Sequence, residues 1–141
     1  KKKILPLAGS KEGIVLLSLA FLNPDDEVLV PDPGYPAYES IAKMIGAKVK
    51  KYDLTPDNQW LPNFEQLKSL VNDKTKLMWI NYPHMPTGKD STPELFDKIL
   101  EFLTLFLHKF HLKILYFLLR LYLTKKHLGQ RPQSFHAILS C

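Results

Sequence analysis

Cysteine is almost absent from this chain. The only cysteine among 141 residues is Cys141, the last one, so no disulfide can form within the chain. This absence excludes the small disulfide-stapled secreted domains and fits a reducing compartment, which we expect to be the cytoplasm. The amino terminus lacks an initiating Met and a long apolar run, because the three opening lysines are followed at once by ILPLAG. We therefore expect no signal peptide, and a start inside a longer protein.

Acidic residues are scarce in the C-terminal part. Residues 1–97 contain 12 Lys or Arg and 13 Asp or Glu, a net charge of −1, whereas residues 98–141 contain 7 basic residues and one acid, Glu101, a net charge of +6. The total of +5 therefore belongs to the tail. Nucleic-acid binding would depend on this tail, which contains no recognisable binding module, so we expect no nucleic-acid partner.

Residues 102–123, which read FLTLFLHKFHLKILYFLLRLYL, contain no Gly, Ala, Val, Asp or Glu. Two origins stay open for this Leu/Phe-rich segment. One is a frameshifted continuation of a truncated gene, and the other is a genuine basic amphipathic helix. Helical spacing supports the second for Lys109, Lys113, Tyr116 and Arg120. Three cations argue against a membrane-spanning helix, which needs about 20 mostly apolar residues, and we disfavour membrane contact by the tail.

Histidine is the one potential metal ligand that recurs in the tail. No carboxylate or cysteine accompanies the closest pair, so we expect no metal site. The histidines concerned are His108, His111, His127 and His136.

Helical and strand-like segments alternate over the first hundred residues. We expect helices at about 11–22, 36–45, 63–71 and from 91 onward, and strands at 27–31, 48–54 and 76–81. This alternation predicts an α/β fold with a mostly parallel sheet and flanking helices. We expect one partial domain over residues 1–100 and a distinct, helical tail over 101–141. Ligands bind at the edge of a parallel sheet where the carboxyl ends of its strands meet, and we call this the ligand edge. We expect residues 32–35 and 82–88 to lie there.

Local signals mark the ends of these helices. Ser10, Asn63 and Ser91 are the expected N-caps, the last with Glu94 at capping-box spacing. Gly46 is expected to close the second helix. The buried face of the first helix is expected to contain Ile14, Leu17, Ala20 and Phe21.

Three motifs carry candidate chemistry. Residues 9–13 read GSKEG at a helix start, where free N–H groups and the helix dipole favour an anion, although a plain helix cap explains them too. Residues 31–38 read PDPGYPAY and present two tyrosines on a stiff turn, which suits stacking on a flat aromatic ligand. The alternative is a turn whose tyrosines cover the core edge. Residues 81–88 read NYPHMPTG, for which a rigid turn is the alternative.

In this order and at this spacing, the three motifs resemble those of class I aminotransferases of fold type I, which use pyridoxal phosphate. The resemblance covers about residues 4–100 and is greatest to aspartate and LL-diaminopimelate aminotransferases with the GSKEGI motif. It implies part of a fold type I large domain, amino transfer between an amino acid and a 2-oxo acid, and a homodimer. The alternatives are another fold type I enzyme, such as a carbon–sulfur lyase, and a non-enzymatic remnant or partner-binding fragment.

The resemblance implies roles for four residues. Gly9, Ser10 and Lys11 match the segment that binds the cofactor phosphate, and Tyr35 matches the residue that stacks on the pyridine ring. Met85 departs from the family, because it stands where an Asn donates a hydrogen bond to the phenolic oxygen of the ring, and a thioether cannot donate.

A second departure is Asp25, which replaces the Gly of the family's Asn-Pro-Gly-Asp turn. Asp tolerates the left-handed backbone conformation better than most residues, so we expect the turn to form.

The largest departure from the family is that its catalytic residues are missing from the sequence after Glu101. The family places an Asp against the pyridine nitrogen and forms a Schiff base with the Lys of a later Ser-x-x-Lys segment. After Glu101 the chain contains neither an acid nor a Ser-x-x-Lys. We therefore assign no catalytic residue and expect this chain alone to be inactive, although the resemblance is to a family of enzymes.

Overall fold

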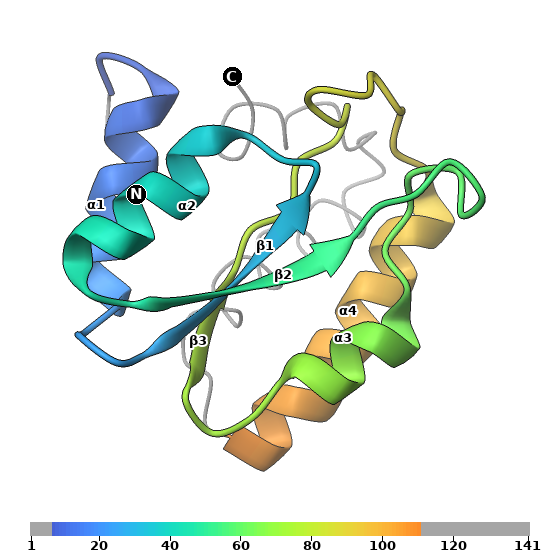
Figure 1. Ribbon diagram of the computed structural model, residues 1–141. Helices are drawn as coiled ribbons and strands as arrows, with labels where there is room; N and C mark the ends of the chain where they lie inside the picture. The colour runs from blue at the N-terminus through green and yellow to red at the C-terminus, as the bar shows by residue number, and fades with distance from the viewer. Residues whose placement is uncertain (1–6, 111–141) are drawn as a thin grey trace, which may run out of the picture.

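The computed structural model describes the backbone of residues 7–110 and the side chains of residues 7–105. Most of the tail, including His111, His127, His136, Lys113 and Arg120, lies outside the described residues. The elements in chain order are α1 (Ser10–Phe21), β1 (Glu27–Asp32), α2 (Pro36–Ile45), β2 (Lys48–Asp53), α3 (Phe64–Leu70), β3 (Thr75–Met78) and α4 (Pro93–Phe110) (Figure 1).

The three strands form one parallel sheet in the order β2-β1-β3, which confirms the expected α/β fold. Val28 of the central strand lies opposite Val49 on β2 and Leu77 on β3. Helices connect successive strands, as parallel pairing requires. The first five residues of β1 are buried, because helices cover both faces of the sheet at its centre.

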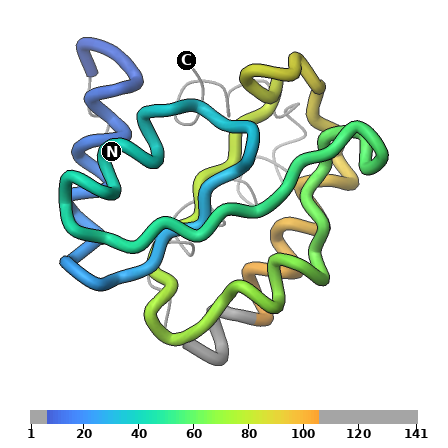
Figure 2. The backbone as a smooth tube through the Cα atoms, in the orientation of Figure 1, coloured from blue at the N-terminus to red at the C-terminus, as the bar shows by residue number. Residues whose placement is uncertain are grey.

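Helices α1 and α2 cover one face of the sheet, and α3 and α4 cover the other (Figures 1 and 2). Side chains alternate between the two faces along β1, as expected for a strand. Val28 and Val30 pack with Ile14 and Ala42 in the first apolar cluster. Leu29 packs in the second cluster, on the side of α3 and α4.

The start of α1 differs from expectation. The helix begins at Ser10, its N-cap is Gly9, and no side chain caps it. Its buried face also differs, because Ser18 and Leu22 are buried with Ile14 while Ala20 and Phe21 are exposed. The residues at 14, 18 and 22 follow an i, i+4 row, and packing against α2 and the sheet selects this row over the more apolar one that contains Phe21.

Two other element boundaries differ from the ones expected from the sequence. β3 ends at Met78 rather than Asn81, although the N–H of Trp79 still donates to the carbonyl oxygen of Leu29 at 2.9 Å. α4 begins at Pro93, and its first turn is capped by Thr92, whose Oγ1 accepts the N–H of Leu95 at 3.2 Å. Proline suits the first helical position because it lacks an N–H, and this moves the cap from Ser91 to the residue just before Pro93.

Three turn and cap expectations are confirmed. Gly46 ends α2 in the left-handed conformation at φ 85°, and Asp25 adopts φ 70°. Asn63 caps α3 by accepting the N–H groups of Glu65 and Gln66 at 3.0 and 3.2 Å. The expected boundary at residue 100 falls inside α4, and Phe102, three residues before the end of the described side chains, is buried.

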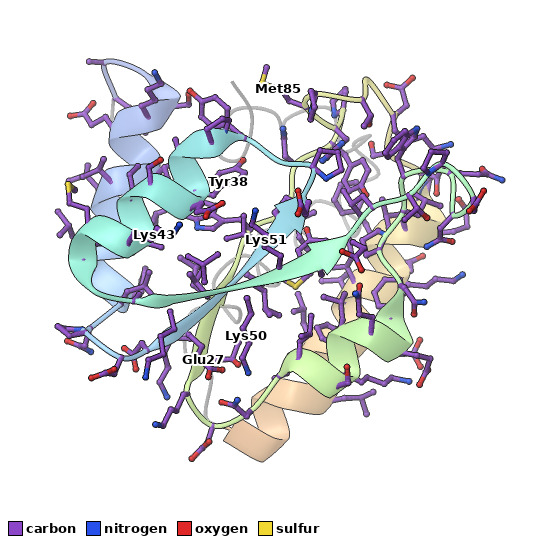
Figure 3. All side chains as sticks on the ribbon, in the orientation of Figure 1. Glu27, Tyr38, Lys43, Lys50, Lys51 and Met85 are labelled. Carbon is purple, nitrogen blue, oxygen red and sulfur yellow. The ribbon has the colours of Figure 1, made fainter. Side chains whose placement is uncertain are left out.

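A buried carboxylate joins the three strands at their amino ends. Glu27 accepts hydrogen bonds from Lys50 Nζ and Asn72 Nδ2, both at 2.8 Å, and lies 3.4 Å from Thr75 Oγ1 (Figure 3). Burial raises the pKa of Glu27, but the hydrogen bonds and the Lys50 charge outweigh it and leave this pKa below its usual value. The ionised carboxylate therefore stabilises the assembled sheet at neutral pH.

No helix within residues 7–110 is both long enough and apolar enough to cross a bilayer.

Candidate functional site

Three motif-bearing segments lie at the carboxyl edge of the sheet. α1 runs antiparallel to β1 and packs beside α2, so its amino end lies at the edge where β1 ends. The turn after β1 and the loop after β3 occupy the same edge because the strands are parallel. All three segments lie along the upper side of Figure 1. The structure thus brings the GSKEG, PDPGYPAY and NYPHMPTG motifs to one edge.

The start of α1 is open. Gly9 has an extended backbone with φ 179°, and a Cβ added there would meet no atom within 4 Å. Ser10 is half-buried and Lys11 is exposed. The first N–H groups of a helix have no intrahelical acceptor, so they favour an anion. The Glu12 carboxylate lies beside this helix start, and its Oε2 accepts the N–H of Ala8 at 2.6 Å.

The turn after β1 is tightly packed around Gly34. A Cβ on this residue would lie 2.3 Å from the carbonyl oxygen of Pro31, a distance that no side chain can occupy. Tyr35 follows as the N-cap of α2 and is half-buried. The turn therefore holds Tyr35 at the edge through backbone geometry.

The Tyr35 ring packs against the buried Tyr38 ring. Its centroid lies 5.7 Å from that of Tyr38 in an edge-to-face arrangement, with an interplanar angle of 81°. Tyr38, labelled in Figure 3, in turn stacks on Trp79, with ring centroids 4.8 Å apart and an interplanar angle of 8°. This row of rings connects the ligand edge with the end of β3 and stabilises Tyr35 in one position.

The loop after β3 combines a buried anchor and an exposed residue. Tyr82 is buried and its hydroxyl donates to the carbonyl oxygen of Trp60 at 2.8 Å. Met85 is 44% exposed, and Figure 3 shows it on the upper side of the molecule. Gly88 closes the loop with φ 73°, a conformation that favours glycine.

One lysine of α2 and one of β2 are held in ion pairs. A Ser-x-x-Lys spacing occurs once before Glu101, at Ser40 and Lys43 of α2. Lys43 is exposed there and pairs with Glu39 at 2.6 Å, so it does not resemble a lysine held ready for covalent chemistry. Lys51 contacts Glu39 at 3.2 Å and Asp32 at 3.6 Å, and the hydrogen bond that its amine donates to Glu39 raises the pKa of Lys51. Lys51 therefore remains protonated at neutral pH.

Buried polar groups at the end of β3 were not found by sequence reasoning. Among the described residues, Trp79 Nε1, Asn81 Oδ1 and His84 Nε2 are buried without a hydrogen-bond partner. The only signal in the sequence was the change from an apolar run to polar residues at position 81. The described residues contain no group of three His, Cys, Asp or Glu side chains placed to hold a metal.

The residues at this edge fit part of pyridoxal phosphate. The open start of α1 suits its phosphate, and the Tyr35 ring suits stacking on its pyridine. Position 85 does not fit, because the Met85 thioether supplies no proton for the phenolic oxygen. The residues at this edge therefore suit two of the three contacts that the family resemblance implies.

Known proteins match the same part of the chain. The family model for aminotransferase class I and II matches residues 1–109. An LL-diaminopimelate aminotransferase of Dehalococcoides mccartyi is 43% identical over 100 residues, which are 71% of this chain and 26% of that protein. The L-glutamine–4-(methylsulfanyl)-2-oxobutanoate aminotransferase of Bacillus subtilis is 39% identical over 100 residues, 71% of this chain and 25% of the relative.

Solved structures agree with these relatives. The apo structure of BacF from Bacillus subtilis superposes with a TM-score of 0.64 at 40% identity, over 67% of this chain and 24% of that one. Tyrosine aminotransferase from Leishmania infantum gives a TM-score of 0.68 at 27% identity, over 73% of this chain and 27% of that one. The chain spans about a quarter of the length of the curated relatives it matches. Motifs, fold and relatives agree, and the chain belongs to the class I and II aminotransferase family.

Proposed function

We propose that this chain is the segment of a pyridoxal-phosphate-dependent aminotransferase that receives the cofactor phosphate and one face of its ring. The observation that carries the proposal is the convergence of the α1 start and Tyr35 on one sheet edge. When bound, the cofactor would supply the electron sink for amino transfer between an amino acid and a 2-oxo acid. The chain itself would bind and orient this group.

Each proposed cofactor residue has a distinct role. The backbone N–H groups of Gly9, Ser10 and Lys11 would donate to phosphate oxygens, with the Ser10 hydroxyl as a further donor and the Lys11 amine as a countercharge. Tyr35 would hold the ring by stacking, and its own position depends on Tyr38. A homodimer and a cytoplasmic location belong to the same proposal, since they follow from the family and from the scarcity of cysteine.

The substrate is not part of the proposal. Relatives named for LL-diaminopimelate and for glutamine with 4-(methylsulfanyl)-2-oxobutanoate match this segment at 43% and 39% identity. Because two relatives named for different substrates match this segment about equally well, the match supports a cofactor-binding role for the segment. Substrate choice would then depend on other parts of these enzymes.

A chimera tests the proposal. Residues 7–100 would replace the matching segment of the Dehalococcoides mccartyi enzyme, with Met85 retained in one version and changed to Asn in another. We expect the Met85→Asn chimera to bind pyridoxal phosphate and transfer amino groups, and the Met85 version to bind it more weakly. A chimera that folds by circular dichroism but binds no pyridoxal phosphate in either version would refute the proposed function.

A further inference from the structure

The chain enters α1 through residues 7–9, and two contacts hold this entry segment against the start of the helix. The N–H of Ala8 donates to Glu12 Oε2 at 2.6 Å. The Leu7 side chain lies over Gly13, because a Cβ added at Gly13 would meet Leu7 Cδ1 at 2.9 Å. The entry segment therefore folds back on helix residues that follow it by four and six positions.

Gly13 needs a reason to stand where it does. It is the fourth residue of α1, and its backbone is not in the left-handed region. Apart from proline, glycine is the least favourable residue inside a helix, because it loses the most conformational freedom on folding. What Gly13 supplies is space for Leu7, which remains 42% exposed and adds little to the core. The contact therefore serves the course of the entry segment rather than core packing.

Glu12 uses its carboxylate in an unusual way. A Glu at the third helical position often reaches back to the N–H of the N-cap residue. Here Glu12 accepts from Ala8, which precedes the N-cap Gly9 by one residue. This hydrogen bond secures the entry segment and leaves the Gly9 N–H to an external anion.

Gly9 has few restraints of its own. Its backbone is extended, with φ 179° and ψ 167°, and no atom lies within 4 Å of the place where a Cβ would stand. A glycine without such neighbours can turn its peptide groups freely. The direction of its N–H therefore depends on the helix that follows it and on the two contacts that precede it.

We propose that Glu12 and Gly13 are positioning residues for the cofactor phosphate, because they hold the entry segment so that the Gly9 N–H points to the anion position at the start of α1. The inference deepens the proposed function and rests on it. Neither side chain is a proposed phosphate donor, and each acts through a residue of the entry segment. Ordering this segment in advance lowers the conformational cost of binding.

Gly13→Ala separates positioning from stability in the 141-residue chain. Alanine favours the helix, and the new methyl group displaces the flexible end of Leu7, so Tm should rise by roughly 4–8 °C. The binding probe is 4-deoxypyridoxine 5′-phosphate, which lacks the aldehyde and cannot react with lysines. We expect roughly fivefold weaker binding, the equivalent of one lost N–H contact. Unchanged affinity in Gly13→Ala would refute its positioning role.

A double-variant cycle tests whether Gly13 acts through Leu7. Leu7→Ala should weaken binding about as much as Gly13→Ala, and the double variant should bind no more weakly than either, because both changes break the same contact. Leu19→Ala, on an exposed position of the same helix, is the control and should leave affinity unchanged. Additive losses in the double variant would overturn the inference.

Two variants isolate the Glu12 hydrogen bond. Glu12→Gln keeps an oxygen that can accept the Ala8 N–H, and Glu12→Ala does not, while both remove the negative charge. We expect Glu12→Ala to bind the probe roughly fivefold more weakly than Glu12→Gln, and its Ala8 amide to exchange faster with solvent. Equal affinities in the two variants would contradict the role of Glu12.

The order of the Gly9 N–H is measured without a ligand. Nitrogen-15 relaxation reports its motion on the picosecond to nanosecond timescale. The order parameter should fall in the three variants that break a contact, and stay near wild type in Glu12→Gln and Leu19→Ala. Unchanged order in all of them would overturn the inference. Absence of probe binding to wild type would count against the proposed function instead, and the order of Gly9 would then decide the positioning role.

Discussion

The turn after β1 provides a sharp test of how Tyr35 is held at the sheet edge. In Gly34→Ala the new methyl group would lie 2.3 Å from the Pro31 carbonyl oxygen and 2.9 Å from Pro31 Cγ. Both atoms belong to Pro31 of β1, whose carbonyl group and ring cannot turn away without moving the backbone. Overpacking in well-packed regions costs typically 1–3 kcal/mol, and we expect about 2 kcal/mol here. For a body of this size, that lowers Tm by roughly 8–16 °C.

Gly9→Ala is the matched control. A Cβ at this position meets no atom within 4 Å and the backbone is extended, so we expect stability within about 0.5 kcal/mol of wild type. Urea unfolding followed by tryptophan fluorescence measures both variants, because Trp79 stacks on Tyr38 next to the affected turn. Equal unfolding midpoints for the two variants would refute the steric explanation of Gly34.

Other parts of the structure give three further predictions. Ser18→Ala should raise stability by about 1 kcal/mol in urea unfolding, because it removes a fully buried hydroxyl with no partner; Ser40→Ala, exposed on α2, controls for helix propensity and should gain less. Glu27→Gln should lower stability at pH 7 by about 1–2 kcal/mol, a figure reduced because the Lys50 partner is 30% exposed. Since the folded-state pKa of Glu27 is lowered, this difference should persist above the ordinary pKa near 4.5 and vanish as pH falls below it; a difference that stays constant down to pH ~3 would contradict the ion pair. Borohydride reduction of the chain with pyridoxal phosphate should label no single lysine stoichiometrically, as peptide mapping would show, because the sequence after Glu101 lacks the Ser-x-x-Lys segment that supplies the Schiff-base lysine in the family.

Helices with clear start and end residues could be predicted from the sequence. The Pro36 start and Gly46 end of α2, and the Asn63 cap of α3, depend on local backbone chemistry that acts the same way in any fold. The apolar run of β1 similarly required cover on both faces, which predicted a parallel sheet between helices. The family motifs then placed the ligand edge, because parallel strands end together.

Features that depend on distant contacts were not predictable. The buried face of α1 turned toward Ser18 instead of Phe21, since packing against α2 and the sheet sets the rotation of a helix and local hydrophobicity does not. His84 is likewise buried although it lies in a loop. The same sequence pattern, a histidine between prolines, would also suit an exposed loop.

The central claim is that the start of α1 and Tyr35 form one cofactor-binding edge, and mapping of a bound analogue tests it most directly. Nitrogen-15 amide spectra of the chain would be recorded with 4-deoxypyridoxine 5′-phosphate and with 4-deoxypyridoxine, which lacks the phosphate. We expect amide shifts at Gly9, Ser10, Lys11 and Tyr35 with the phosphorylated analogue, much smaller shifts without the phosphate, and roughly fivefold weaker binding in Ser10→Ala. Shifts confined to residues 111–141, or equal shifts with both compounds, would contradict the claim.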